Sequence, residues 1–175
     1  MYYRMYQSGI GKEHGEKMTV VNFYDNVDDK LLKFAVMIAK SQDKYVFCKH
    51  RERSTWEVPG GHRDPGESVL DTAKRELYEE TGAVAFELRP VCVYSVIVED
   101  NGQESFGMLY YADIRSFKME LYRKSGGECV VLMGNLEELH SEIEKITITD
   151  KLPEDWTYPE IQPKLLEEAQ NRGFL

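Results

Sequence analysis

The sequence is poor in cysteine and contains no long apolar run. Its three cysteines, Cys48, Cys92 and Cys129, are far apart and form no CxxC pair. One thiol would be left over from any pairing, so we expect reduced cysteines and a cytoplasmic protein. The polar first 17 residues carry no hydrophobic signal core, and no stretch is long enough to span a bilayer. We therefore expect neither secretion by a standard signal nor a membrane-spanning segment.

Positive charge is also scarce. The 175 residues contain 22 lysines and arginines against 31 aspartates and glutamates, a net charge of −9. This balance disfavours duplex nucleic acid or an anionic membrane as the main partner. A small anionic substrate is compatible with it, because carboxylates can recruit such a substrate through bound metal. The length suits one domain over residues 1–175, with residues 1–17 as an irregular N-terminal arm.

One short segment combines glycines with several acidic residues. Residues 60–83 read GGHRDPGESVLDTAKRELYEETGA, a glycine-rich turn followed by a helical pattern. Ser68, with Asp71 three positions later, resembles a capping box, so the helix should begin near residue 68. Gly82 is suited to end it, because glycine readily adopts the left-handed conformation found after helices.

Three glutamates of this helix, Glu76, Glu79 and Glu80, fall on one face. Like charges at these spacings repel by about 0.2–0.5 kcal/mol per pair, and carboxylates in a last helical turn oppose the helix dipole. Local rules broken without local compensation are typical of a functional site. The simplest compensation is a divalent cation such as Mg²⁺ or Mn²⁺, which takes oxygen ligands.

An acidic run on a helix is more often only a solvated face. Here its context is a fixed pattern: Gly61, five residues, Glu67, seven residues, and then RELYEETGA over residues 75–83. The segment resembles the Nudix box of the Nudix hydrolases, with every charged and glycine position met. Ala83 alone departs from the pattern, since a larger aliphatic residue is usual there, and this affects packing rather than chemistry.

The resemblance implies the Nudix fold, an α/β (α+β) domain whose mixed β-sheet is sandwiched between helices. Composition and alternation favour strands at residues 19–24 (an edge strand), 31–40, 45–48, 91–98, 105–113 and 129–133. Residues 41–44 read as the turn of a hairpin. We expect a short helix at residues 137–143 and an amphipathic C-terminal helix at residues 158–172 that covers the sheet. Trp56 is expected to be a packing residue rather than a base-stacking platform.

The resemblance also implies roles for residues of the box. Glu79 and Glu80, with the Gly60 carbonyl, are the expected metal ligands, and Glu76 is a third ligand or the general base. Arg75 is expected to hold and orient the acidic side chains. Glu67 would orient the loop or support an outer metal ion. Crowding of these carboxylates should raise the pKa of one of them in the metal-free protein.

Other expected site residues lie outside the acidic helix. Glu128 is the best candidate by position for a further metal-binding carboxylate, with Glu120 behind it. Lys49 and Arg51 belong to a basic strand end that is either a solvated surface or a contact for the substrate phosphates or base. Gly61 allows the substrate close to the backbone.

The expected activity is hydrolysis of a nucleoside diphosphate linked to another group. Among such substrates we favour a nucleoside triphosphate, including oxidised purine nucleotides, as in MutT-like members, giving a nucleoside monophosphate and pyrophosphate. ADP-ribose, dinucleoside polyphosphates and 5′-capped RNA are the alternatives. A non-catalytic nucleotide-sensing module would be a different class, which the intact glutamates argue against, and a structural Ca²⁺ module lacks the required loop. Both a monomer and a homodimer remain open.

Overall fold

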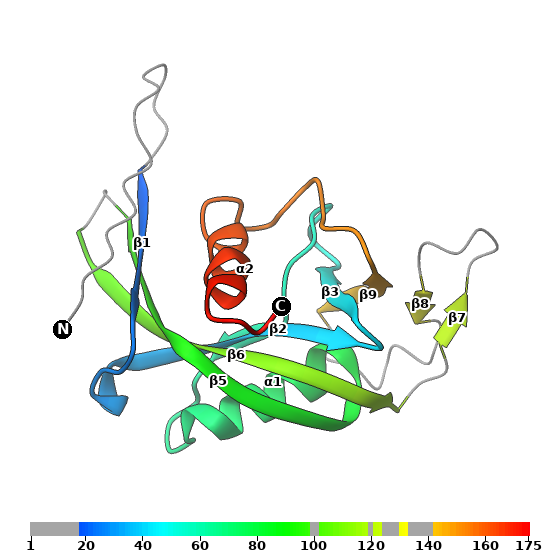
Figure 1. Ribbon diagram of the computed structural model, residues 1–175, viewed down its shortest axis with the longest axis horizontal. Coiled ribbons are helices and arrows are strands. Elements are labelled where there is room, and N and C mark those ends of the chain that lie inside the picture. The colour runs from blue at the N-terminus through cyan, green and yellow to red at the C-terminus, as the bar shows by residue number, and fades with distance from the viewer. Residues whose placement is uncertain (1–17, 99–101, 119–120, 124–129, 133–141) are drawn as a thin grey trace.

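The computed structural model describes residues 18–98, 102–118, 121–123, 130–132 and 142–175 (Figure 1). Within these residues one mixed sheet carries a helix on each face, which confirms the predicted fold class. The expected arm at residues 1–17, the candidate ligands Glu120 and Glu128, and residues 137–141 of the expected short helix lie outside the described residues. No described helix combines the length and apolar character needed to cross a membrane.

The described strands form one sheet in the order β1-β5-β6-β2-β3-β9-β8-β7, with β4 paired to β2. Only β2 and β6 run parallel among these pairs; the others are antiparallel. The bounds are β1 Thr19–Tyr24, β2 Leu32–Ser41, β3 Lys44–His50, β4 Gly60–His62, β5 Ala83–Val98, β6 Glu104–Phe117, β7 Leu121–Arg123, β8 Val130–Leu132 and β9 Ile143–Thr149. A short 3₁₀ turn, Asp29–Leu31, precedes β2.

The predicted edge strand and hairpin are both present. β1 has the predicted bounds and lies at the end of the sheet, paired to β5. β2 and β3 form the hairpin, and the two residues at its tip, Gln42 and Asp43, have positive φ of 52° and 64°. Such a pair of left-handed residues is the two-residue turn whose twist matches that of paired strands.

The largest differences from the prediction are at β5 and β9. β5 begins at Ala83, directly after the helix, and not at residue 91; its pairing shifts register between Pro90 and Cys92, because proline has no N–H for the ladder. β9 was not predicted, and the helix expected at residues 137–143 is wrong at Ile143, where β9 begins. The segment IEKITIT alternates and is β-branched, and β9 buries Ile143, Ile146 and Ile148 beside β3.

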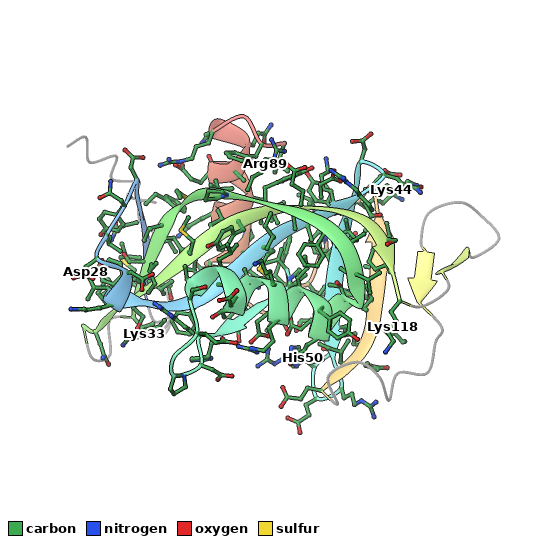
Figure 2. All side chains as sticks on the ribbon, turned by 90° about the horizontal axis from the view of Figure 1, so that it is seen from below. Asp28, Lys33, Lys44, His50, Arg89 and Lys118 are labelled. Carbon is green, nitrogen blue, oxygen red and sulfur yellow. The ribbon has the colours of Figure 1, made fainter. Side chains whose placement is uncertain are left out.

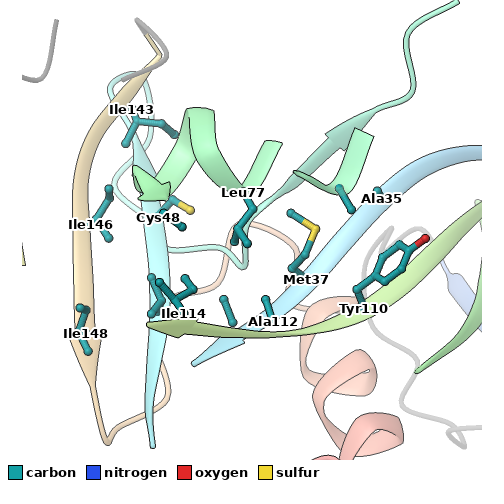
Figure 3. Packing of buried hydrophobic residues seen from close by; sticks show 14 residues of the cluster. Ala35, Met37, Cys48, Leu77, Tyr110, Ala112, Ile114, Ile143, Ile146 and Ile148 are labelled. Atoms are coloured by element: carbon teal, nitrogen blue, oxygen red, sulfur yellow. The ribbon is translucent and has the colours of Figure 1, made fainter. Parts of the chain in front are cut away.

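Helix α1, Val69–Thr81, covers one face of the sheet. As predicted, the Ser68 hydroxyl accepts a hydrogen bond from the Asp71 N–H at 3.1 Å, and Gly82 ends the helix with a left-handed φ of 72°. Leu77 is fully buried against Met37 and the other apolar side chains of this layer (Figure 3). Leu70, which continues the apolar stripe, stays 40% exposed because it lies in the first turn, beyond the sheet.

Helix α2, Gln162–Asn171, covers the opposite face of the sheet (Figure 1). It begins later than the predicted residue 158, because Pro163 occupies its first turn, where a missing N–H costs nothing. Leu165, Leu166 and Ala169 pack into a second apolar cluster between helix and sheet, and Trp56 packs against the same cluster. The two helices therefore isolate two apolar layers, and the residues between β3 and α1 run between them.

Candidate active site

The glycine turn at residues 60–61 lies against the acidic helix with no room for side chains. A Cβ atom added at Gly61 would overlap the carboxylate of Glu76. A Cβ at Gly60 would lie 2.6 Å from the Ala35 carbonyl oxygen and 2.8 Å from the Val36 Cα. Both glycines are thus required by close approach, at Gly61 to the acidic side chain itself and at Gly60 to strand β2.

Arg75 contacts three of the four box glutamates. Its Nε and Nη2 donate to the two carboxylate oxygens of Glu67 at 2.8 and 3.0 Å. Its Nη1 donates to Glu76 Oε1 at 2.7 Å and to Glu79 Oε2 at 3.1 Å. Nη2 also donates to the His62 carbonyl oxygen at 3.0 Å. One guanidinium therefore fixes the acidic face of α1 to the loop that precedes it.

Glu67 is occupied by hydrogen bonds on both oxygens. Besides Arg75, it accepts from the Thr72 hydroxyl at 2.9 Å and from the Asp64 N–H at 3.2 Å. The hydrogen bonds from Arg75 are the main cause that lowers the pKa of Glu67 to about 2. Of its two expected roles, this geometry supports orientation of the loop.

Glu80 has an environment separate from that of the three glutamates that Arg75 contacts. It is 7% exposed, accepts a hydrogen bond from the Gly60 N–H at 2.8 Å, and lies 3.9 Å from the Cys48 Sγ. Burial raises the pKa of Glu80, and the charge of Glu76 adds to this rise, while the hydrogen bonds from His50 and Gly60 oppose it. The expected rise is thus present, with burial rather than crowding as its larger cause.

His50 and Glu57 complete this environment, and the sequence argument missed both. The His50 Nε2 lies 2.8 Å from Glu57 Oε1 and 3.5 Å from Glu80 Oε1 (Figure 2 shows His50 beside α1). Glu57 is 5% exposed and also pairs with the Arg53 Nη1 at 3.2 Å. The Glu80 carboxylate raises the pKa of His50 most, burial lowers it and the Glu57 charge raises it; burial raises the pKa of Glu57.

Backbone pairing explains why Glu57 reaches the site. The segment before the glycine turn pairs with β3, with Cys48 and Glu57 exchanging two hydrogen bonds of 2.9 Å each. This pairing carries Glu57 to the end of β3, beside His50. A buried carboxylate requires such a partner, and no local pattern in the sequence reveals which residue provides it.

These residues line one cavity of about 670 Å³. Its acidic end includes Gly60, Gly61, Arg75, Glu76 and Glu80 together with His50, Arg53 and Glu57. Much of the remaining wall is apolar and aromatic, with side chains from β2, β5 and the start of α2: Phe34, Val36, Tyr94, Val96, Val98, Ile161 and Leu165. The cavity therefore combines charged groups with apolar walls, and Phe34 and Val36 of these walls lie directly beside the glycine turn.

Four expected site residues do not line this cavity in the described structure: Lys49, Arg51, Glu67 and Glu79. Lys49 Nζ pairs with Glu144 at 3.2 Å, and Arg51 Nε donates to the Ile143 carbonyl oxygen at 3.4 Å. Successive side chains of a strand alternate, so a cavity-facing His50 turns its two neighbours away. Of this basic strand end, His50 and Arg53 reach the cavity.

The donors at the acidic end are of the kind that hard divalent cations prefer. No group of three or more His, Cys, Asp or Glu side chains in the described part of the chain stands ready to enclose a metal ion. Arg75 and His50 supply positive charge to the carboxylates in this state. The carboxylate oxygens of Glu76 and Glu80 beside the Gly60–Gly61 turn fit a hard cation that would replace these partners.

Comparisons with known proteins agree with this geometry. A putative 8-oxo-dGTP diphosphatase of Bacillus subtilis is 41% identical over 49 residues, which cover 28% of this chain and 32% of that protein. An RNA pyrophosphohydrolase of Bartonella quintana is 40% identical over 53 residues, which cover 30% of this chain and 31% of that protein. The chain thus spans about a third of the length of these two relatives.

Among solved structures, the Bacillus subtilis pyrophosphohydrolase BsRppH is similar over 99% of both chains, with a TM-score of 0.66 and 21% identity. At this identity the likeness shows a shared fold. The NUDIX domain family matches residues 29–128, more than half of the chain and the whole of the glycine turn and acidic helix. Because this match covers more than half of the chain and includes the box, the chain belongs to the Nudix hydrolase family.

Proposed function

We propose that the protein hydrolyses a nucleoside triphosphate between the α- and β-phosphorus, giving a nucleoside monophosphate and pyrophosphate, with Mg²⁺ or Mn²⁺. The observation that carries the proposal is that Glu76 and Glu80 meet the Gly60–Gly61 turn in one cavity. Its volume of about 670 Å³ is within the range of small-molecule sites, roughly 300–1,000 Å³. The charged groups suit the phosphates and the apolar walls suit the base.

Glu76, Glu79 and Glu80, with the Gly60 carbonyl, would hold the cation. When bound, it neutralises phosphate charge and lowers the pKa of coordinated water. Arg75 fixes the Glu76 carboxylate through Oε1 at 2.7 Å, which orients it as a ligand or as the base that accepts a proton from water. His50 orients Glu80 from the opposite side of the cavity end.

The substrate class is proposed from what the relatives' names share. An 8-oxo-dGTP diphosphatase and an RNA pyrophosphohydrolase both act on a nucleoside that carries a 5′ phosphate chain. A free nucleoside triphosphate is the first candidate. The 5′ end of RNA is the second, favoured by the 40% identity over 53 residues to the Bartonella enzyme. ADP-ribose and dinucleoside polyphosphates remain alternatives for the same chemistry.

We also propose a cytoplasmic location. Cys48 and Cys92 are buried and free, and Cys129 lies outside the described residues. Free buried thiols support a reducing compartment.

The test is turnover of nucleoside triphosphates and of 5′-triphosphorylated RNA with Mg²⁺ in H₂¹⁸O, with the products identified by mass. We expect a nucleoside monophosphate and pyrophosphate, with the label showing which phosphorus water attacked. Glu167→Gln, on the exposed side of α2, is the control for loss of a carboxylate elsewhere. Release of orthophosphate with the nucleoside diphosphate left behind would contradict the proposal. Turnover of ADP-ribose alone would move the protein to another substrate class.

A further inference from the structure

Two buried side chains in the wall of the cavity carry hydrogen-bond donors. Neither donor has a partner in the described part of the chain. Tyr94 on β5 is 5% exposed and Gln162 on α2 is 6% exposed, and both line the cavity. Within the described residues, the only hydrogen bond of the Gln162 amide comes from the Val58 N–H, and none reaches the Tyr94 hydroxyl. No side-chain nitrogen or oxygen that is itself fully buried lacks a partner in the described residues, so these two groups face the open space of the cavity, where a bound ligand can pair with them.

The orientation of the Gln162 amide follows from its one bond. Its Oε1 accepts from the Val58 N–H at 3.3 Å. A backbone N–H can only donate, so this contact assigns the oxygen and leaves the NH₂ group as the unpaired end. At this position the Gln162 NH₂ group is free to donate into the cavity, while one lone pair of its oxygen is already taken by Val58.

Tyr94 is seated by a glycine on the neighbouring strand. Tyr94 pairs with Gly107 of β6, and a Cβ atom there would lie 2.5 Å from the Tyr94 Cζ and 2.6 Å from its hydroxyl oxygen. Burial raises the pKa of Tyr94, so its hydroxyl keeps its proton and can donate or accept. Apolar neighbours along the wall, Val36, Val96 and Leu165, suit the faces of a flat ring.

One short piece of backbone contacts both Gln162 and Glu80. Val58 donates its N–H to Gln162 and Gly60 donates its N–H to Glu80, at 3.3 and 2.8 Å. Two residues of chain span at most about 7 Å, so the Gln162 amide oxygen and the Glu80 carboxylate oxygen lie within about 13 Å. Both lie on the one cavity, so a single nucleotide can meet Gln162 with its base and the acidic end with its phosphates.

We propose that Gln162 and Tyr94 select the nucleotide base, favouring a 6-oxo purine (guanine or hypoxanthine) over adenine. The 6-oxo purine edge presents O6 and N7 as acceptors, whereas adenine presents an amine donor at position 6. That amine faces the Gln162 donor without a hydrogen bond, and an unpaired buried donor is costly. Gln162 therefore discriminates, and Tyr94 adds affinity for either base. This inference rests on the proposed function.

The experiment compares kcat/KM for GTP, ITP and ATP. In the wild type, GTP and ITP should exceed ATP by about tenfold or more, the scale of one unpaired group at a specific site. Gln162→Glu keeps an oxygen for the Val58 N–H and replaces the NH₂ donor by an acceptor, so the GTP/ATP ratio should fall by about tenfold. Tyr94→Phe should raise KM for all three nucleotides and leave the ratio unchanged.

Two matched controls separate these effects from charge and stability. Gln170→Glu makes the same change on the exposed side of α2, and Tyr110→Phe removes a buried hydroxyl from the α1-side cluster, away from the cavity. Both should keep the wild-type ratio. The melting temperature of each variant shows whether it is folded.

Failure of the inference and failure of the proposed function give different results. Turnover with equal kcat/KM for GTP and ATP, or a ratio that Gln162→Glu leaves unchanged, overturns the inference alone. Absence of turnover with every nucleotide overturns the proposed function. In that case calorimetric titration of GMP, IMP and AMP into the metal-free protein decides the base preference by itself: tighter binding of GMP and IMP supports it, and equal binding refutes it.

Discussion

Gly61 and Glu76 fit together only because residue 61 has no side chain: a Cβ atom there would overlap the Glu76 carboxylate. Glu76 is also held from the helix side by Arg75 at 2.7 Å. Its carboxylate is therefore confined between a backbone and a guanidinium, with little freedom to move. A small change at position 61 acts directly on the orientation of this acid.

Gly61→Ala should consequently damage catalysis more than binding. The added methyl displaces Glu76, and loss of a positioned acid or base lowers kcat by about a hundredfold or more. Steady-state kinetics should show this fall in kcat with a smaller change in KM. Gly66→Ala, where nothing lies within 4 Å, is the control; its φ of 88° makes that change a cost in stability, not in the position of Glu76. Normal kcat in Gly61→Ala would contradict the confinement.

Changing Glu76, Glu79 or Glu80 to Gln should lower kcat by about a hundredfold or more each, as expected for lost acid–base or charge stabilisation. The variants should fold, since removing one of several like charges relieves repulsion. Kinetics at saturating Mg²⁺ measure the effect, with Glu167→Gln as the unaffected control. Near-normal turnover of Glu80→Gln would remove Glu80 from the metal site.

The metal-free protein should gain stability as the pH falls from about 8 toward about 5. The folded-state pKa values of Glu80, Glu57 and His50 are raised, so these groups bind protons more tightly when folded. Their contribution is present below the unfolded pKa and is lost as the pH rises through the folded one. Melting temperatures across this window should rise with acidification, and the slope should be smaller in Glu80→Gln.

Glu67 should produce the opposite dependence at lower pH. Its pKa is lowered to about 2 in the folded state from 4.5, chiefly by Arg75. The stability it contributes is therefore present above about pH 4.5 and is lost as the pH falls toward about 2. Acid unfolding can be followed by circular dichroism. Measured from its own stability at neutral pH, the wild type should lose stability at higher pH than the Glu67→Gln variant does. Identical acid profiles would mean that the ion pair with Arg75 is screened by solvent.

Divalent cations should raise the melting temperature beyond the effect of NaCl at equal ionic strength. A ligand that binds only the folded state stabilises it by RT ln(1 + [L]/Kd), about 2.7 kcal/mol at a hundred times Kd. The rise with Mg²⁺ or Mn²⁺ should shrink in Glu79→Gln. An equal rise in both proteins would show that the cations only screen the net charge of −9.

The last prediction concerns the two basic residues Arg53 and Lys49. Arg53 lines the cavity and pairs with buried Glu57, whereas Lys49 pairs with Glu144 on β9. Arg53→Ala should raise KM for the nucleotide more than it lowers kcat, the mark of lost ground-state binding. Lys49→Ala, which removes the same charge one strand position from His50, should leave both constants near the wild-type values. A larger effect from Lys49→Ala would restore the original assignment.

The parts of the fold that could be predicted are those with local signals. The cap at Ser68, the end at Gly82 and the hairpin turn at Gln42–Asp43 depend on neighbouring residues only. The β9 segment has a clear alternating pattern, yet we predicted no strand there and extended the expected helix of residues 137–143 to its first residue, Ile143. In a stretch of seven residues, the pattern of apolar residues alone does not decide between a helix and a strand.

The site could be predicted only where its residues and their spacing lie within one segment, as in residues 60–83. Glu57 becomes a site residue through His50, seven positions earlier, and Gln162 through Val58, more than a hundred positions earlier. Lys49 and Arg51 were assigned by charge, although strand alternation decides which face they occupy. Tertiary pairing supplies this information.

The backbone from Val58 to Gly60 has a consequence for how this protein can change over time. One N–H anchors a side chain of α2 and the other anchors a side chain of α1, so the two helices meet the cavity through separate contacts. Mutations at the cavity-lining residues of α2 and β5, which lie outside the apolar layer beneath α1, should leave the glutamates in place. A variant library confined to those two elements would therefore explore new substrates at constant phosphate chemistry, whereas the same effort spent on α1 would yield mostly inactive clones.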